Sequence, residues 1–290
     1  MKNIIAGIGE LLWDMLPDGK KIGGAPANFA YHVSQFGLDS CVVSAVGHDP
    51  LGEEIIDILT RKGLNFIIER VDRPTGTVLI ELDAQGVPVY DITRHVAWDH
   101  IPFTPSILEL ALNSRAICYG SLAQRGDMSR QTINRFMDLM PEHALKICDI
   151  NLRQNFYTRE VLESSMYRCN ILKINDEELE TITPLLSLPP LDMQEKCRHL
   201  LEAYNLKILI LTCGVNGSYV FTPSLTNFLP TPKIEVVDTV GAGDSFTAAF
   251  IASLLQGKSI ESAHERAVEV SAYVCTQHGA MPRLPERLTR

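Results

Sequence analysis

The hydrophobic pattern of this chain alternates between two kinds of segment along most of its length. Short runs rich in Ile, Leu and Val predict buried strands, and the longer amphipathic segments between them predict helices. Such alternation is typical of an α/β fold with a mostly parallel sheet covered by helices. The predicted strands are residues 4–8, 41–46, 116–119, 145–150, 171–174 and 207–211. The main predicted helices are residues 25–36, 52–61, 130–140, 176–181 and 193–204.

One region departs from this alternation. Residues 77–82 and 87–94 are typical of two strands joined by a turn at 83–86, where Gly86 suits a positive φ. We expect this hairpin to form a small lid over the site together with residues 10–22, and an edge hairpin of the main sheet is the alternative. An exposed hairpin favours association, which predicts a homodimer through the lid. The hydrophobic residues of this hairpin are Val78, Ile80, Val87, Val89 and Ile92.

Composition limits the classes of function. The chain has 290 residues, 46% of them hydrophobic, which is enough for one large α/β domain with a small appendage. A formal net charge of -9 argues against a nucleic-acid-binding surface, which needs a positive field. Glu10 and Asp14 interrupt the apolar N-terminal stretch, so no signal peptide is expected. No apolar run approaches the ~20 residues of a membrane span. We therefore expect a cytoplasmic protein without a membrane partner.

The seven cysteines predict neither disulfides nor a zinc site. Their number is odd, no two form a CxxC pair, and most lie within apolar runs. Buried reduced thiols explain this distribution best. They are Cys41, Cys118, Cys148, Cys169, Cys197, Cys213 and Cys275.

The segment Asp238-Thr-Val-Gly-Ala-Gly-Asp-Ser-Phe246 carries the strongest chemical signal. It follows a β-branched run, residues 234–237, that predicts a strand, and it precedes an apolar, Ala-rich run that predicts a helix. Gly241 and Gly243 permit a tight turn whose N–H groups converge at the helix N-terminus, an arrangement that favours a phosphate. Asp244 could then accept a proton from an incoming hydroxyl. The alternative is a glycine turn in which Asp244 only caps the helix.

A second glycine turn, Ile22-Gly-Gly-Ala-Pro-Ala-Asn28, precedes a predicted helix. Paired glycines allow the backbone to approach a ligand, although such turns are also common without one. Asn28 offers both a donor and an acceptor to a sugar hydroxyl, and Asp14 could accept from two hydroxyls. Gly7-Ile-Gly9 is followed by Leu12 where a dinucleotide-binding fingerprint needs glycine, which argues against that class.

Polar residues also follow two neighbouring predicted strands. In Asp149-Ile-Asn-Leu-Arg153 the polar side chains alternate, so they share one face if the strand continues. Asn175 and Glu178 are spaced i, i+3 and share one helical face, from which they would contact Mg²⁺ through water. The alternative for both segments is a capped helix start with solvated acids.

Two further glycine segments suit a nucleotide. Thr212-Cys-Gly214 and Gly217-Ser218 lie between two predicted strands, where a turn without side chains can accept phosphates and base. Gly279-Ala280 follows a long helical run and could border the adenine. Each of these segments, taken alone, is equally a tight connection.

In this order and spacing, the segments resemble those of the PfkB, or ribokinase-like, carbohydrate kinases. The two family signatures correspond to Gly23-Gly-Ala-Pro-Ala-Asn28 and Asp238-Thr-Val-Gly-Ala-Gly-Asp244. Between them, Asn175-Asp-Glu-Glu178 fits the N-x-x-E motif and Thr212-Cys-Gly-Val-Asn-Gly217 fits the ATP-binding turn. The resemblance implies one kinase domain over residues 1–290, with a three-layer αβα, Rossmann-like sheet and a β lid at about 10–22 and 66–100.

The resemblance also implies roles for individual residues, with ATP and Mg²⁺ as cofactors, K⁺ in some members, and a sugar as the other partner. Asp244 looks like the base, and the amides of Gly241, Ala242 and Gly243 look like the anion hole. The residues on the sugar side are Asp14, Gly24, Asn28, Arg94, Asn151 and Arg153. Those on the nucleotide side are Asn175, Thr212, Gly214, Gly217, Gly279 and Ala280, with Glu178 and Asp238 in the metal region.

Within the family, Gly9-Glu-Leu-Leu-Trp-Asp14 and Asp149-Ile-Asn-Leu-Arg153 look most like fructokinases. Gln124 stands near the position where ribokinases often have a sugar-binding glutamate, which argues against ribose. A kinase of 2-keto-3-deoxygluconate, ribose or adenosine remains an alternative. A phosphosugar kinase would need a basic cluster, for which Arg70, Arg73 and Arg94 are candidates. A non-catalytic sugar-binding regulator is the rival from another class.

Overall fold

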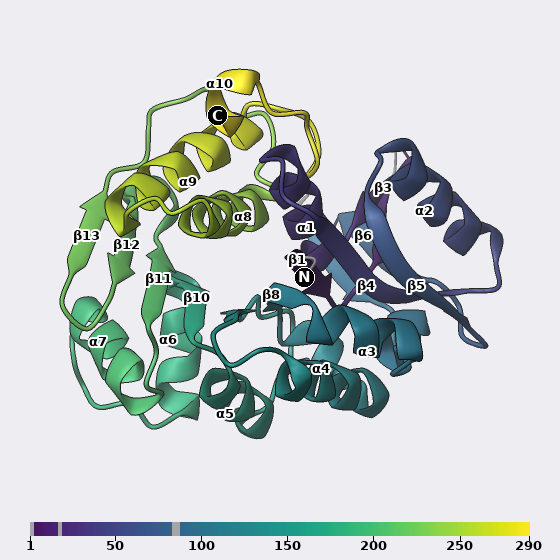
Figure 1. Ribbon diagram of the computed structural model, residues 1–290, viewed down its shortest axis with the longest axis horizontal. Coiled ribbons are helices and arrows are strands. Elements are labelled where there is room, and N and C mark those ends of the chain that lie inside the picture. Colours follow the sequence, from purple (N-terminus) through teal and green to yellow (C-terminus); the bar gives the residue numbers. More distant parts are fainter. Residues whose placement is uncertain (1–2, 17–18, 83–87) are drawn as a thin grey trace.

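The computed structural model describes residues 3–16, 19–82 and 88–290, and their main element is a nine-stranded sheet (Figure 1). Its parallel strands run from β11 to β5, and an antiparallel hairpin, β12 with β13, extends one edge. In spatial order the strands are β13 (Thr226–Leu229), β12 (Ser218–Phe221), β11 (Ile208–Thr212), β10 (Ile171–Asn175), β9 (Leu145–Asp149), β8 (Ser114–Tyr119), β1 (Ile4–Ile8), β4 (Ser40–Gly47) and β5 (Asn65–Val71).

Helices cover both faces of this sheet, so the three-layer α/β prediction is confirmed (Figure 1). Alternation along β1 shows why: Ile5 packs in the cluster with α1, α8 and α9, whereas Ala6 and Ile8 pack in the cluster with α3 to α7. The helices are α1 (Ala25–Gln35), α2 (Pro50–Arg61), α3 (Pro105–Leu112), α4 (Asp127–Leu139), α5 (Arg159–Arg168), α6 (Asp176–Leu185), α7 (Met193–Ala203), α8 (Ala242–Leu255), α9 (Ile260–Cys275) and α10 (Glu286–Thr289).

A separate four-stranded sheet forms the small β lid and excludes the edge-hairpin alternative. Its strands in order are β3 (Gly19–Gly23), β2 (Leu12–Leu16), β6 (Gly76–Leu82) and β7 (Pro88–Ile92). The expected range of the lid was too wide, because residues 66–71 belong to β5 and pair with β4 in the main sheet. The predicted turn at 83–86 lies outside the described residues.

Two residues of the predicted association surface are buried inside the protein. Val78 and Ile92 are 5% and 4% exposed and belong to the main core, so they offer no surface to a partner. Leu79, on the opposite face of β6, is 44% exposed. Strand alternation accounts for the difference, since neighbouring residues point to opposite faces of the small sheet.

The predicted strand at 234–237 is wrong. These residues have no regular structure, and Val236 and Val237 are exposed. A β-branched run becomes a strand only where a neighbouring strand and a buried face are available. The sheet instead ends at β13. Residues 231–241 form an exposed connection between β13 and α8.

The prediction of reduced thiols is confirmed, because all seven cysteines are free and all except Cys275 are buried. Every helix in the described part of the chain is too short or too polar to cross a membrane.

Candidate functional site

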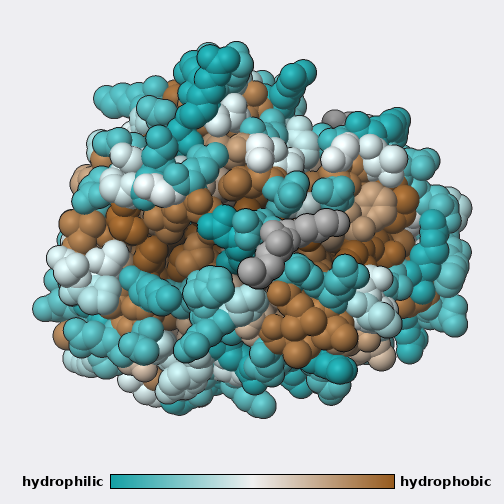
Figure 2. All heavy atoms as spheres, in the orientation of Figure 1, coloured by the Kyte–Doolittle hydropathy of each residue, from teal (hydrophilic) through white to brown (hydrophobic). Residues whose placement is uncertain are grey.

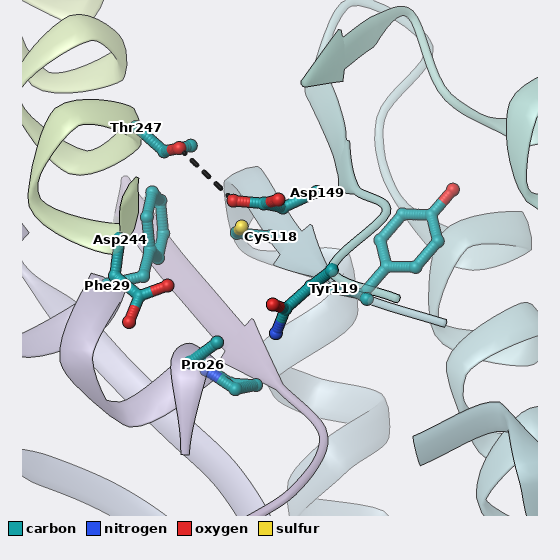
Figure 3. Close-up of a pocket in the computed structure, with 10 residues that line it drawn as sticks. Pro26, Phe29, Cys118, Tyr119, Asp149, Asp244 and Thr247 are labelled. Atoms are coloured by element: carbon teal, nitrogen blue, oxygen red, sulfur yellow. Dashed lines mark hydrogen bonds between the residues drawn. The ribbon is translucent and has the colours of Figure 1, made fainter. Parts of the chain in front are cut away.

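The residues singled out by the sequence converge where several strands end. A pocket lies at the carboxyl ends of β8 and β9, between the first turns of α1 and α8 (Figure 3). Asp149 and Asp244 both project into it from different elements. Parallel α/β sheets bind ligands at this edge because the loops that follow the strands gather there. Its polar lining comes from Asp149, Asn151, Asp244 and Thr247.

The N-terminus of α8 has the geometry of an anion site. Gly241 caps the helix with φ 78°, a left-handed conformation, and no side chain caps the first turn. A Cβ at Gly241 would lie 2.8 Å from Ala280, so both φ and space require glycine here. The Ala242 amide already donates to the Thr239 carbonyl at 3.2 Å. Among the described residues the amides of Gly241 and Gly243 have no protein acceptor, which leaves them for an anion.

Asp244 lies in the first turn of α8 as a half-buried carboxyl and not as the helix cap. Its Oδ2 accepts a hydrogen bond of 2.7 Å from Nδ2 of Asn28, on the first turn of α1. Burial and the nearby charge of Asp149 raise the pKa of Asp244 to about 6, against the lowering effect of the Asn28 hydrogen bond. A half-buried carboxyl with a pKa near neutrality is suited to accept a proton in catalysis.

Lys173 is a central residue of the site that the sequence reasoning missed. It is 7% exposed, and its Nζ lies 3.1 Å from Oδ1 of Asp149. Burial lowers the pKa of Lys173, but the charges of Asp149 and Glu178 outweigh this effect and raise it overall. A Cβ added to Gly243 would lie 3.0 Å from the Lys173 ammonium, so this cation stands directly beside the N-terminus of α8. The signal was a lone charged residue within the apolar run of β10.

Asp149 links this lysine to α8. Its Oδ2 accepts a hydrogen bond of 3.4 Å from Oγ1 of Thr247 (Figure 3). The expectation that the polar residues of 149–153 share one strand face is wrong, because β9 ends at Asp149 and Asn151 has φ 47°. The turn nevertheless brings Asn151 into the pocket, whereas Arg153 is exposed.

Asn175 and Glu178 form a capping box at the start of α6. The Glu178 carboxylate accepts bonds of 2.9 Å from the amides of Leu152 and Asn175. Burial raises the pKa of Glu178, and the charge of Lys173 opposes that rise. Glu178 is fixed by these amides and can hold Mg²⁺ through its remaining lone pairs or through water. No group of three or more His, Cys, Asp or Glu in the described chain forms a protein-only metal site. Mg²⁺ with one or two carboxylates and substrate phosphates fits such a donor set.

Two of the residues predicted to contact the sugar, Asp14 and Gly24, lie where the chain passes between the lid and the main sheet. Asp14 lies on β2, and burial raises its pKa while the charges of Arg153 and Lys21 lower it. Gly24 caps α1 with φ 125°, and a Cβ there would lie 2.4 Å from the Glu10 carbonyl oxygen. Glycine is therefore required for the chain to pass from the lid into α1.

The side chains of Arg94 and of the residues that follow it, as far as Asp99, differ in their exposure to solvent. Arg94 is exposed and stacks on the Phe156 ring at 4.7 Å. Trp98 and Asp99, which follow it in the sequence, are buried. Asp99 forms a salt bridge of 2.8 Å with Arg125, whose guanidinium lies over the Trp98 ring. Both side chains therefore pack within the protein.

Two of the residues predicted to contact the nucleotide, Gly214 and Gly279, border the exposed 231–241 segment. Gly214 and Gly217 have φ values of 51° and 105°, as a turn without side chains requires. Asp238 accepts bonds of 3.0 Å from the amides of Val240 and Gly279. Hydrophobic residues gather on the same face of the molecule, over β10 to β12 (Figure 2). The exposed ones in these segments are Val215, Phe228, Val236, Val237 and Val240.

Ala280 and Gln124 have structural contacts that the sequence did not reveal. Ala280 packs against Gly241, and its carbonyl accepts a bond of 2.8 Å from the buried His32 ring on α1. Gln124 donates to the Gly120 carbonyl at 2.8 Å and to Ser165 Oγ at 2.9 Å. Both bonds come from its amide nitrogen, and the side chain is buried.

Comparison with known proteins agrees with this geometry. The model of the pfkB family carbohydrate kinases matches residues 18–287. A probable fructokinase-3 of Arabidopsis thaliana is 29% identical over 98% of this chain and 89% of its own. An ATP-dependent 6-phosphofructokinase of Thermoanaerobacterium thermosaccharolyticum is 27% identical over 96% and 90%. The structure of a fructokinase with bound ATP from Xylella fastidiosa superimposes with a TM-score of 0.86 at 21% identity, over 98% and 96%. The chain belongs to the pfkB family of carbohydrate kinases and is a sugar phosphotransferase.

Proposed function

We propose that this protein is a fructokinase, which transfers the γ-phosphoryl group of ATP to a primary hydroxyl of fructose. The observation that carries the proposal is the half-buried Asp244, which accepts a 2.7 Å bond from Asn28 and lies beside the free amides at the N-terminus of α8. This places a proton acceptor and an anion site next to each other. The fructokinase names among the relatives support the choice of sugar.

In the proposed reaction, Asp244 accepts the proton of the sugar hydroxyl as that oxygen attacks the phosphorus. The amides of Gly241 and Gly243 bind the equatorial oxygens of the transferring group, and Lys173 lies close enough to add a positive charge. Phosphoryl transfer depends mainly on placement and on neutralising charge, and this set of groups supplies both. The Asp149 carboxylate accepts hydrogen bonds from both Lys173 and Thr247, and so fixes the position of the lysine relative to α8.

Two sets of residues are proposed for the cofactors. Glu178 and Asn175 would hold Mg²⁺, directly or through water, and the ion would supply positive charge to the phosphate oxygens of ATP. Thr212, Gly214, Gly217 and Gly279 border the nucleotide. If this kinase binds K⁺, the ion would lie in the segment that contains Asp238. Asp14 on the lid strand β2 binds the sugar together with Gly24 and Asn28 at the start of α1, and Asn151, Arg153 and Arg94 lie on the same side. Lid closure would exclude water, the competing phosphoryl acceptor.

A panel of acceptors tests the proposal: ADP release from MgATP with fructose, ribose, 2-keto-3-deoxygluconate, adenosine and fructose 6-phosphate. We expect turnover with a preference for fructose. Preference for another acceptor would leave the proposed mechanism of phosphoryl transfer in place but would show that fructose is not the substrate. The phosphofructokinase relative makes fructose 6-phosphate the informative competitor. Absence of turnover with every acceptor, with binding retained, would favour the non-catalytic regulator.

We also expect a cytoplasmic homodimer in which two lids associate. Leu79, an exposed hydrophobic residue on the outer face of β6, supports association through the lid. Val78 and Ile92 do not, because they are buried. Light scattering should give twice the chain mass of 32.2 kDa at micromolar concentration. Leu79→Asp should shift the equilibrium toward monomer, whereas the same change at the exposed Leu112 on α3 should not. A monomeric mass for the unmodified protein would contradict the prediction.

A further inference from the structure

His264 is a buried histidine that the proposed mechanism does not use. It lies on α9, where this helix packs against β12, β13 and α8 (Figure 1). Its ring meets the Phe246 ring of α8 edge to face, with the two ring centroids 5.9 Å apart. Burial lowers the pKa of His264 to about 4, so the ring is neutral at physiological pH and has one donor and one acceptor nitrogen.

Both ring nitrogens of His264 have a partner in the edge hairpin of the main sheet. Nδ1 lies 2.5 Å from Oδ1 of Asn227 on β13, an oxygen that can only accept, so Nδ1 carries the proton. Nε2 is then the acceptor, and the hydroxyl of Ser218 on β12 donates to it at 2.7 Å. One tautomer of the ring satisfies both partners. A substitution on either side would leave a buried polar group unpaired.

Ser218 closes the glycine turn that is proposed to contact the nucleotide. It follows Gly217 directly and pairs with Thr212 across the hairpin of β11 and β12. Within the turn, the amide of Cys213 donates to the Gly217 carbonyl at 2.8 Å. The bond from Ser218 to His264 therefore fixes the end of this turn to α9.

Asn227 leads to the same turn from its other side. The next two residues of β13, Phe228 and Leu229, lie directly against the turn. A Cβ added to Gly217 would lie 2.7 Å from the Phe228 ring and 2.5 Å from the Leu229 carbonyl oxygen. The bond between Asn227 and His264 fixes β13 to α9. The two nitrogens of one ring thus hold two segments that meet at Gly217.

We propose that His264 is a positioning residue for the nucleotide: its two hydrogen bonds hold the 212–217 turn in the shape that receives ATP. This inference rests on the proposed contacts of that turn with the nucleotide. The ring also joins the turn to the helix of the proposed base, because Phe246 lies two residues after Asp244 on α8. A turn that is already held in its bound shape loses less conformational entropy when the nucleotide binds, which raises the affinity.

Ser218→Ala tests the first bond without an acceptor substrate. Calorimetric titration with MgADP should give a Kd about two- to tenfold higher than in the unmodified protein, the range that one net hydrogen bond represents. Denaturant titration should show a folded-to-unfolded ratio lower by on the order of 10-fold, because the His264 nitrogen loses its donor.

Ser114→Ala is the matched control for this variant. Ser114 is also buried and also donates a 2.7 Å bond, to the Leu110 carbonyl, at the end of β8 that lies away from the pocket. Its loss should lower stability to a similar extent and leave the Kd for MgADP unchanged. If Ser218→Ala behaves in the same way, its bond is merely structural and the proposal is overturned.

A double-variant cycle tests whether His264 is the partner through which Ser218 acts. His264→Phe keeps a ring against Phe246 and removes both bonds, so its Kd for MgADP should exceed that of Ser218→Ala. Adding Ser218→Ala to it should then change the Kd little. An equal effect of Ser218→Ala in both backgrounds would overturn the proposal. If His264→Phe does not fold, Asn227→Ala replaces it, and an unchanged Kd for MgADP in that variant would count equally against the proposal.

Turnover separates this inference from the choice of sugar. With the accepted sugar, Ser218→Ala should raise the KM for MgATP by the same factor as the Kd and leave kcat and the KM for the sugar unchanged. A change in kcat or in the sugar KM alone would overturn the inference. If no acceptor is turned over but MgADP binds, the sugar assignment fails, and the calorimetric comparison still decides the role of His264. If the unmodified protein does not bind MgADP, the nucleotide role of the turn fails and this inference with it.

Discussion

Asp244→Asn is expected to lower kcat by about 10²–10⁴-fold, the range that general-base catalysis contributes. The amide keeps the size of the side chain and its ability to accept the 2.7 Å bond from Asn28, so the geometry of α1 and α8 should persist. The affinity for the sugar should therefore stay nearly unchanged, and the loss should appear in kcat. Steady-state kinetics with the sugar and MgATP varied separately would measure both quantities.

The same substitution should stabilise the fold at neutral pH. The pKa of Asp244 is raised from 3.8 to about 6, so ionisation at pH 8 costs the folded state about 3 kcal/mol that the amide does not incur. This stability difference should vanish as the pH falls below 3.8. Asp127→Asn, at an exposed carboxylate on the first turn of α4, should change neither kcat nor stability by much. A variant of Asp244 with full kcat would remove the residue from the mechanism.

The sequence predicted those parts of the fold and site that depend on local signals. Strands such as β1 and β10 are apolar runs of the right length, and α1 and α8 begin where glycines and Pro26 permit. Because the carboxyl ends of parallel strands share one edge, motifs far apart in the chain could be assigned to one site. This reasoning placed Asp149 and Asp244 together without any knowledge of their distance.

The rest depends on pairings that local sequence does not encode. Residues 66–71 and 234–237 have similar β propensity, yet only the first find a partner strand, in β4. The buried position of Asp99 could not be read from its neighbours in the sequence, because its partner Arg125 comes from a distant segment. The role of Lys173 could not be predicted for the same reason. A single charged residue in an apolar run indicates no function until the fold places Asp149 beside it.

The buried pair of Lys173 and Asp149 leads to the second large prediction. Lys173→Met keeps the volume of the side chain but leaves Asp149 and Glu178 without their cation. Breaking a buried ion pair by removing one partner costs about 3–5 kcal/mol, so the free energy of unfolding should fall by about this amount at pH 7. Lys196→Met is the matched control, because Lys196 pairs at 2.9 Å with Glu180, an exposed carboxylate. That change should cost less than about 1 kcal/mol.

The double variant Lys173→Met, Asp149→Asn separates the structural from the chemical role of the lysine. With the opposing charge also removed, most of the lost stability should return, since a neutral pair no longer buries an uncompensated charge. The kcat should remain low, because the cation 3.0 Å from the Cβ position of Gly243 is still absent from the anion site. Recovery of both stability and kcat would mean that Lys173 serves only to neutralise Asp149. Recovery of stability alone would assign the lysine to the transferring phosphoryl group, since the remaining loss would then belong to the reaction and not to the fold.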